Sequence, residues 1–107
     1  MSTATTSTIT LKGRSGASYV FELYEWGTSF RPVAGVYAVL RRDTDGFAVI
    51  YVGQTGDLSE RFDDHHKAWC FDRERKTHIG VRLDSSEQSR LATEADLVAN
   101  YRLPCNG

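Results

Sequence analysis

Four side chains of this sequence have the chemistry to hydrolyse a phosphate ester together. Tyr37 lies in the segment GVYAVLRR, Tyr51 opens the segment YVGQTGDLSERF, and Arg61 lies near the end of that second segment. A guanidinium can bind two phosphate oxygens at once, and a carboxylate such as that of Glu94 can hold a divalent metal ion together with water molecules. Phosphodiester hydrolysis needs such cations and an activated water, so these residues form a candidate site.

Glu94 is the residue that fits its predicted element least well. At 100° per residue it falls inside the apolar stripe of the last predicted helix, whereas Asp96 points roughly the opposite way, toward solvent. The stripe consists of Leu91, Ala95, Val98 and Tyr101. An unpaired buried carboxylate is costly, so Glu94 must have a partner, be protonated or lie at the stripe's exposed edge. A salt bridge to an arginine and a metal ligand are both open interpretations.

His65 lies four residues after Arg61, so the two side chains should be neighbours on the surface of a predicted helix. It falls on the apolar stripe of that helix, where it is either a core histidine or part of the site. The other members of the stripe are Leu58, Phe62 and Trp69. A zinc site of His65, His66 and His78 is disfavoured, because neighbouring positions on a helix do not converge.

These residues would be positioned by an α+β fold with a small central antiparallel sheet flanked by helices. Alternating and β-branched segments predict strands at residues 9–12, 19–24, 35–42, 47–53 and 78–83. The third and fourth segments are apolar on both faces, so we expect them at the centre of the sheet. Turn residues between the first two and between the third and fourth predict two hairpins.

Two helices complete the predicted fold. Asp57 can cap the first helix, with Glu60 three residues later as the second half of a capping box, and this helix should end near Cys70. A charged loop, FDRERKT, should follow it. Ser85 or Ser86 can cap the last helix, which should end near residue 101, before a proline.

Length and composition predict a single domain. We expect residues 1–8, which are rich in serine and threonine, to be disordered, and residues 9–107 to form one domain with a hairpin at 9–24 and a core at 34–107. The chain is 40% hydrophobic and 25% charged, which is typical of a soluble globular protein. No apolar run approaches the roughly 20 residues that span a bilayer, and no signal-peptide pattern is present. We therefore expect a cytoplasmic protein without a membrane partner.

Charge and cysteine usage narrow the expected partners. A net charge of −1 argues against a broad electrostatic contact with nucleic acid, but arginines outnumber lysines ten to three, which leaves room for a small phosphate site. Cys70 and Cys105 belong to no C-x-x-C pair, so a zinc cluster is not expected. In the cytosol both cysteines should be reduced.

Five elements of the sequence resemble the GIY-YIG nuclease superfamily. They occur in order and with family-like separations across residues 35–107: GVY at 35–37, YVG at 51–53, Arg61, Glu94, and Asn106 in PCN. The N-terminal hairpin resembles an addition seen in short stand-alone bacterial members. The resemblance implies a metal-dependent endonuclease that hydrolyses phosphodiester bonds in DNA.

The resemblance also implies a role for each matching residue. Glu94 would hold one divalent ion, Mg²⁺ or Mn²⁺. Tyr51, or alternatively Tyr37, would be the general base that activates the attacking water. Arg61 would bind the scissile phosphate, and His65 would contact the phosphate or assist proton transfer.

Three further residues would order the site or contact the phosphate. Asn106 would anchor the C-terminal segment, and Gly53 would leave room beside Tyr51. Gln54 stands where some relatives have lysine and others glutamine. Because the pKa of a free tyrosine is about 10, Arg61 and the metal ion must favour the phenolate, or else the metal-bound water loses its proton first and the phenol relays it.

Two other functions are compatible with the sequence. The low net charge and the lack of a second DNA-binding domain favour a non-catalytic nucleic-acid-binding or protein-interaction module on the same fold. Alternatively, Glu94 and Arg61 form a structural ion pair without a substrate. For a nuclease of this size, a partner protein or a homodimer would supply target choice.

Overall fold

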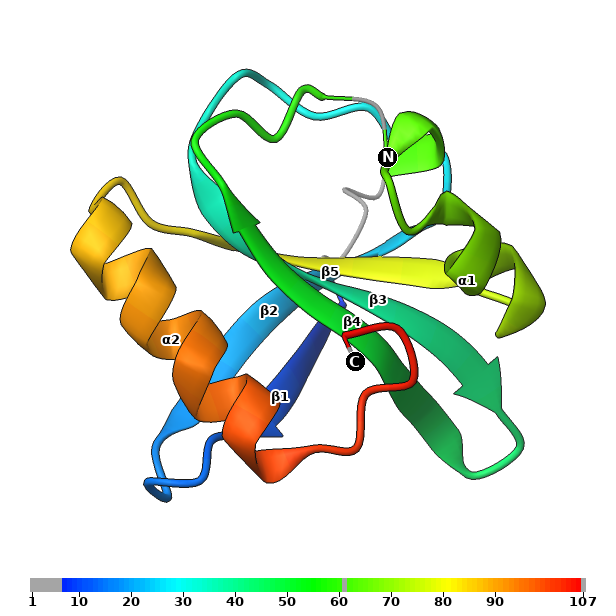
Figure 1. The fold of residues 1–107 in the computed structure, drawn as a ribbon, viewed down its shortest axis with the longest axis horizontal. Helices are drawn as coiled ribbons and strands as arrows, with labels where there is room; N and C mark the ends of the chain where they lie inside the picture. The colour runs from blue at the N-terminus through cyan, green and yellow to red at the C-terminus, as the bar shows by residue number, and fades with distance from the viewer. Residues whose placement is uncertain (1–6, 61, 107) are drawn as a thin grey trace, which may run out of the picture.

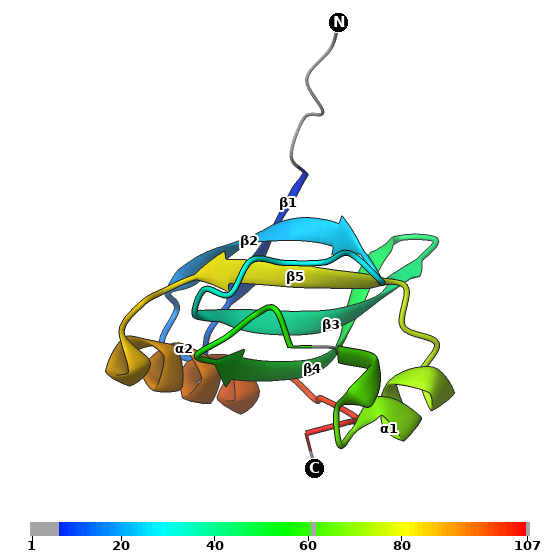
Figure 2. The ribbon, with the colours of Figure 1, turned by 90° about the horizontal axis from the view of Figure 1, so that it is seen from above.

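The computed structural model describes residues 7–60 and 62–106, and of Asp63 only the backbone. In these residues five antiparallel strands form one twisted sheet in the order β1-β2-β5-β3-β4 (Figure 1). Figure 2 shows this order from β1 to β4. The strands are β1 (Thr8–Lys12), β2 (Ser18–Glu25), β3 (Gly35–Asp43), β4 (Gly46–Thr55) and β5 (His78–Leu83). The helical elements are the 3₁₀ turn η1 (Phe62–Asp64), α1 (Ala68–Arg73) and α2 (Glu87–Asn100). The predicted α+β class and the predicted strands are confirmed.

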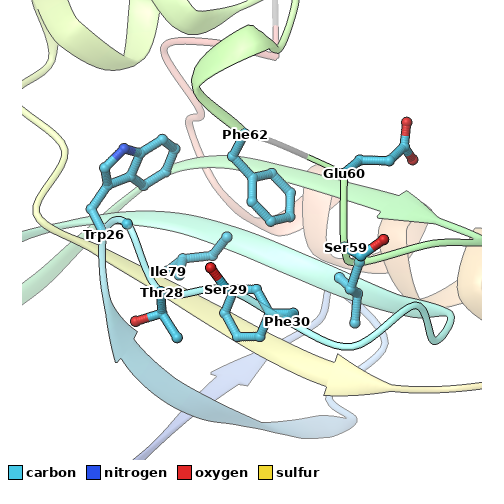
Figure 3. A pocket seen from close by; sticks show the side chains of 10 residues that line it. Trp26, Thr28, Ser29, Phe30, Ser59, Glu60, Phe62 and Ile79 are labelled. Atoms are coloured by element: carbon cyan, nitrogen blue, oxygen red, sulfur yellow. The ribbon is translucent and has the colours of Figure 1, made fainter.

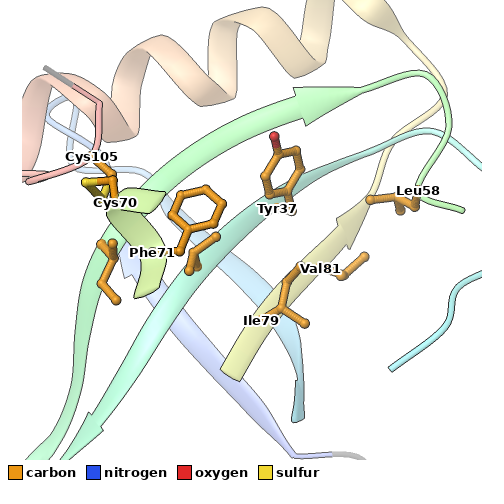
Figure 4. Close-up of a cluster of buried hydrophobic side chains, with 9 residues drawn as sticks. Tyr37, Leu58, Cys70, Phe71, Ile79, Val81 and Cys105 are labelled. Atoms are coloured by element: carbon orange, nitrogen blue, oxygen red, sulfur yellow. A yellow bond between two sulfur atoms is a disulfide. The ribbon is translucent and has the colours of Figure 1, made fainter. Parts of the chain in front are cut away.

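The sheet has a hydrophobic core on each face. Tyr37 of β3 belongs to the cluster that contains Phe71 of α1 (Figure 4), and the next residue, Ala38, belongs to the cluster that contains Leu97 of α2. Because successive strand residues point to opposite faces, the two helices cover opposite faces of the sheet. Figure 1 shows them on either side of β4. Within the described residues, no helix has the length and apolar character required to cross a bilayer.

β4 lies at the edge of the sheet, so the prediction that both apolar strands are central is wrong for this one. The C-terminal segment covers its open edge. The N–H of Cys105 donates to the carbonyl of Ile50 at 3.1 Å. The side-chain amide of Asn106 accepts from the N–H of Val52 and donates to its carbonyl, both at 2.9 Å. One amide side chain thus takes the place of a neighbouring strand at this position.

The helix predicted from Asp57 to Cys70 is wrong. Thr55 binds the N–H of Asp57 and the carboxylate of Glu60, which in the expected capping box would have bound each other. Its hydroxyl accepts from the N–H of Asp57 at 3.0 Å and donates to the carboxylate of Glu60 at 2.7 Å. The Asp57 carboxylate accepts instead from the N–H of Ser59 at 2.8 Å, which closes a local turn.

Regular helix begins only at α1, whose first residue, Ala68, lies eleven residues after the predicted cap. α1 extends to Arg73, so the first three residues of the predicted charged loop, 71–73, are helical. Phe71 in that segment is fully buried, whereas Trp69, which we predicted for the apolar stripe, is 60% exposed. The predicted helical stripe therefore does not exist.

α2 begins where predicted, but it buries a different face. Its N-cap is Ser86, whose hydroxyl accepts from the N–H of Ser89 at 3.2 Å. Leu91 and Val98 are 47% and 38% exposed, so the predicted apolar stripe is wrong and Glu94 does not lie within one. The buried residues of this helix are Arg90, Thr93 and Leu97.

Polar contacts set the rotation of α2. The guanidinium of Arg90 donates to the side-chain oxygen of Gln54 on β4 at 2.9 Å. Asp96, which we predicted to face solvent, accepts from the N–H of Ser15 at 2.9 Å and from the hydroxyl of Tyr19 at 2.7 Å. The N-terminal hairpin and β4 therefore hold the helix at two positions along its length.

Cys70 and Cys105 form a disulfide, so the prediction that both are reduced is wrong (Figure 4). The bond joins α1 to the C-terminal segment, immediately before Asn106, and it closes a loop of 35 residues. It therefore ties the helix on one face of the sheet to the segment that covers the edge of β4.

Removing this disulfide should lower the free energy of unfolding. For a loop of 35 residues, the loss of the chain-entropy effect amounts to about 3–4 kcal/mol. Equilibrium denaturation of the Cys70→Ala/Cys105→Ala variant beside the oxidised wild type measures it. Wild-type protein kept in excess reductant serves as the control and should approach the value of the variant. Equal stability of oxidised and reduced wild type would contradict the prediction.

Candidate active site

A pocket of about 590 Å³ lies at the edge formed by β4, where the two faces of the sheet meet. It brings together residues from the strands, from the segment before α1 and from α2. Among its lining residues are five that the sequence predicted for the site: Tyr37, Tyr51, Gln54, His65 and Glu94. Arg61, a sixth, lies outside the described residues.

A β-bulge in β4 brings Tyr51 onto the same face as Tyr37. The register with β3 shifts between Val39 and Leu40, which leaves Ile50 as an extra residue. Regular alternation would turn Tyr51 toward α2, whereas the bulge turns it toward α1. The two tyrosine rings are stacked, with centroids 6.0 Å apart.

Gly53 is the residue that lets the two rings approach β4. A Cβ atom at this position would lie 2.7 Å from both Cζ and Oη of Tyr37 and 2.8 Å from Cε1 of Tyr51. Such distances are shorter than any real contact of a Cβ atom, so a larger residue would displace the rings. The predicted role of Gly53, to leave room beside Tyr51, agrees with this geometry.

His65 holds the hydroxyl of Tyr37 and has a defined tautomer. The N–H of Lys67 donates to its Nδ1 at 3.0 Å, so Nδ1 carries a lone pair. Burial lowers the pKa of His65, which keeps the ring neutral near pH 7. The single proton of the neutral ring therefore lies on Nε2, which donates to Oη of Tyr37 at 2.8 Å.

Of the two phenols, Tyr51 is the one that ionises first. Burial raises the pKa of both tyrosines, and raises that of the more deeply buried Tyr37 much further. The hydroxyl of Tyr37 hydrogen bonds to that of Tyr51, which raises the pKa of Tyr37 and lowers that of Tyr51. Because Oη of Tyr37 accepts from His65, its own proton is free to be donated to Tyr51.

Glu94 is half-buried in the pocket, and burial raises the pKa of its carboxyl group. The main-chain N–H of Gln54 hydrogen bonds to the carboxylate and partly offsets this effect. Among the described residues, no cation forms an ion pair with Glu94. Its negative charge in turn raises the pKa of Tyr37 and Tyr51. The carboxylate and the phenols thus oppose each other's ionisation, and a cation between them would stabilise all three anions.

The donor atoms in the pocket suit a hard divalent ion. Glu60 and Asp64 line the same pocket as Glu94, so oxygen ligands predominate. Mg²⁺ commonly takes one or two protein carboxylates and keeps several water molecules. In the part of the chain that the structure describes, no three histidine, cysteine, aspartate or glutamate side chains are grouped as a complete set of metal ligands.

Arg90 supports the wall of the pocket, and the sequence pattern did not single it out. It is only 6% exposed, and its guanidinium donates to Gln54 at 2.9 Å and to the carbonyl of Asp84 at 3.1 Å. These bonds hold Gln54 at the pocket and fix the turn of α2 that carries Glu94. The sequence did contain one indication of its position, because Arg90 and Glu94 are four residues apart and so lie on the same side of a helix.

Asn106 lies outside the pocket. Its amide pairs with Val52, the neighbour of Tyr51, and so holds the C-terminal segment against β4 behind the tyrosine. This placement is consistent with the anchoring role that the resemblance implies for it.

Comparison of the chain with models of known protein families, with curated proteins and with solved structures found no match in any of the three. The resemblance to the GIY-YIG superfamily therefore stays a prediction from the residues of this sequence.

Gly53→Ala should destabilise the fold and disturb the tyrosine pair. The added methyl group collides with both rings, and overpacking of this kind costs about 1–3 kcal/mol. Gly56→Ala is the matched control, because a Cβ atom there meets nothing within 4 Å. Chemical denaturation gives the free energies of unfolding, and NMR spectra of the tyrosine rings report their displacement. Equal effects of the two substitutions would refute the role of Gly53.

Glu94→Gln should stabilise the metal-free protein at neutral pH. Since burial raises the pKa of Glu94 above its value in the unfolded chain, its charged form destabilises the fold once the pH exceeds the unfolded pKa. Removing the charge should raise the free energy of unfolding by up to about 1 kcal/mol, a small figure because water screens the half-exposed side chain.

This gain should vanish below about pH 4, where the carboxyl group is protonated in both states. Denaturation in the presence of a chelator, at neutral and at acidic pH, measures both values. Glu87→Gln, an exposed position in the first turn of the same helix, is the control and should give no gain. A large loss of stability at neutral pH would instead identify Glu94 as half of a structural ion pair.

Proposed function

We propose that this protein is a metal-dependent endonuclease of the GIY-YIG type that hydrolyses phosphodiester bonds in DNA. The observation that carries the proposal is the meeting of two phenols, a neutral imidazole and a half-buried carboxylate in one pocket. The phenols come from β3 and β4, the imidazole comes from the segment that precedes α1, and the carboxylate comes from α2. The bulge, the close approach at Gly53 and the polar contacts of α2 all act to bring them together.

Glu94 is the residue that would hold Mg²⁺ or Mn²⁺. When bound, the ion supplies Lewis-acid stabilisation of the negative charge on the phosphate. Glu60 lines the same pocket, and the carboxylates of Glu60 and Glu94 repel a phosphate, a repulsion that a bound cation would offset. Binding of DNA at this pocket and binding of the metal are therefore coupled.

Tyr51 is the proposed general base. As a phenolate it takes one proton from the attacking water, and its charge is stabilised by the hydrogen bond that Tyr37 donates to it. His65 in turn donates to Tyr37, which orients the phenol. Attack on phosphorus breaks the bond to the leaving sugar oxygen, and this oxygen takes a proton from solvent. A role for Arg61 in binding the phosphate rests on the sequence alone.

A non-catalytic module on the same fold is the second candidate. The net charge of −1 and the carboxylates of Glu60 and Glu94 in the pocket favour it, because both weaken binding of a polyanion in the absence of metal. Such a module would bind nucleic acid or a protein partner without cutting.

Purified protein should nick or cut DNA in the presence of Mg²⁺ or Mn²⁺, and a chelator should abolish the activity. Glu94→Gln and Tyr51→Phe should each lower the rate at least about a hundredfold, because each removes a group that acts in the transition state. Gel assays with supercoiled, branched and single-stranded DNA measure the rates and reveal the preferred substrate.

Glu87→Gln, on the same helix but outside the pocket, should keep the full rate. Cutting that survives both active-site substitutions would come from a contaminant and would remove the catalytic assignment. DNA binding without cutting of any substrate would favour the module.

A further inference from the structure

A second pocket is lined by aromatic rings (Figure 3). It lies beside the candidate active site, with which it shares lining residues. We call it the aromatic pocket; its volume is about 510 Å³. Trp26 and Phe30 come from the connection between β2 and β3, and Phe62 comes from η1. Two buried aliphatic side chains, Leu58 and Ile79, contribute to its lining.

The rings of the aromatic pocket stand around a hollow and do not close on one another. The centroids of Trp26 and Phe62 are 6.3 Å apart with planes at 57°, and those of Phe30 and Phe62 are 6.3 Å apart with planes at 81°. These separations lie toward the long end of aromatic contacts. All three side chains are half-buried, so part of each ring remains accessible.

The aromatic pocket is continuous with the candidate active site. Phe62 and Glu60 line both pockets. The ring of Phe62 lies 4.8 Å from that of Tyr37, whose hydroxyl binds His65. A ligand in the aromatic pocket is therefore separated from the tyrosine pair by the width of one ring.

The lining combines flat apolar surfaces with a polar rim. Thr28, Ser29, Ser59 and Glu60 are exposed and surround the rings. A nucleobase has the matching features, since it presents two π-faces for stacking and hydrogen-bonding groups at its edge. In a nucleotide the base is joined through the sugar to the phosphate, so two adjoining pockets can hold its two ends.

We propose that the aromatic pocket binds an unpaired nucleobase of DNA next to the phosphate in the candidate active site. This inference rests on the proposed function, and it names the substrate class: DNA with a single-stranded segment. A base within an intact duplex is stacked and paired, so it cannot enter between Trp26, Phe30 and Phe62.

Phe30→Leu tests the stacking role, because it keeps an apolar side chain and removes the ring. Affinity for a short single-stranded deoxyoligonucleotide, measured by fluorescence anisotropy with Ca²⁺ in place of Mg²⁺, should fall about tenfold. Affinity for a blunt duplex of the same sequence should be unchanged. Trp69→Leu is the matched control, since this ring is 60% exposed and lines neither pocket, and it should change neither affinity.

Trp26 provides a direct optical signal of base stacking. The chain has two tryptophans, so Trp69→Phe leaves Trp26 as the only one, and its emission can be excited selectively over that of the tyrosines. The single-stranded oligonucleotide should quench its emission, and the blunt duplex should not. Adding Phe30→Leu to this variant should shift the quenching curve to about tenfold higher oligonucleotide concentration. Thermal unfolding of each variant shows whether the fold is intact.

The outcomes separate this inference from the proposed function. An equal loss of affinity for single strand and duplex, or no loss for either, overturns the aromatic pocket as a base site, even if the protein cuts DNA. Selective loss for the single strand together with quenching of Trp26 supports it. If that result is obtained but no DNA is cut with Mg²⁺ or Mn²⁺, the base site stands and the nuclease proposal falls.

Discussion

The close approach of two tyrosine rings to the backbone at Gly53 is the contact on which the rest of the site depends. No side chain larger than hydrogen fits there, since a Cβ atom would lie 2.7 Å from the phenol of Tyr37. The bulge at Ile50 brings the second ring, that of Tyr51, to the same face. On the outer edge of the strand, the amide of Asn106 pairs with Val52 and keeps the backbone in place. The two phenols can therefore interact with each other because β4 has a bulge at Ile50, has no side chain at Gly53 and is held at its edge by Asn106.

The carboxylate reaches this pocket because polar contacts override the apolar pattern of its helix. α2 buries an arginine and a threonine but only one large apolar residue, Leu97. Hydrogen bonds from Arg90 to Gln54 and from Ser15 and Tyr19 to Asp96 fix its rotation instead. The N-terminal hairpin therefore has a structural part in placing the carboxylate, although it lies far from the pocket in sequence.

The sequence was sufficient where local patterns decide the structure and insufficient where distant partners do. The strands follow from alternation, and the start of α2 follows from the cap at Ser86. Tyr37 and Tyr51 could be placed in neighbouring strands because they lie in one hairpin, but the bulge that puts both rings on the same face could not be predicted. The buried face of α2 could not be predicted, because it depends on contacts with two other elements. The pairing of Cys70 with Cys105 could not be predicted either, because it depends on where the C-terminal segment lies along the edge of β4.

The largest error of prediction falls on the segment that separates the two pockets. A regular helix from Asp57 would have placed Leu58, Phe62 and His65 on one stripe, against one core. Instead, Thr55 binds the N–H of Asp57 and the carboxylate of Glu60, and the Asp57 carboxylate binds Ser59, so the capping box does not form. As a result Leu58 lines the aromatic pocket, His65 lines the candidate active site, and Phe62 lies between them. Local rules tend to fail where a chain is shaped for function, because such sites require conformations that propensity alone does not favour. The irregular segment that replaces the helix lies between a pocket lined by carboxylates and an apolar pocket lined by rings. This combination suits the DNA substrate proposed above, because a nucleotide carries a charged phosphate at one end and a flat base at the other.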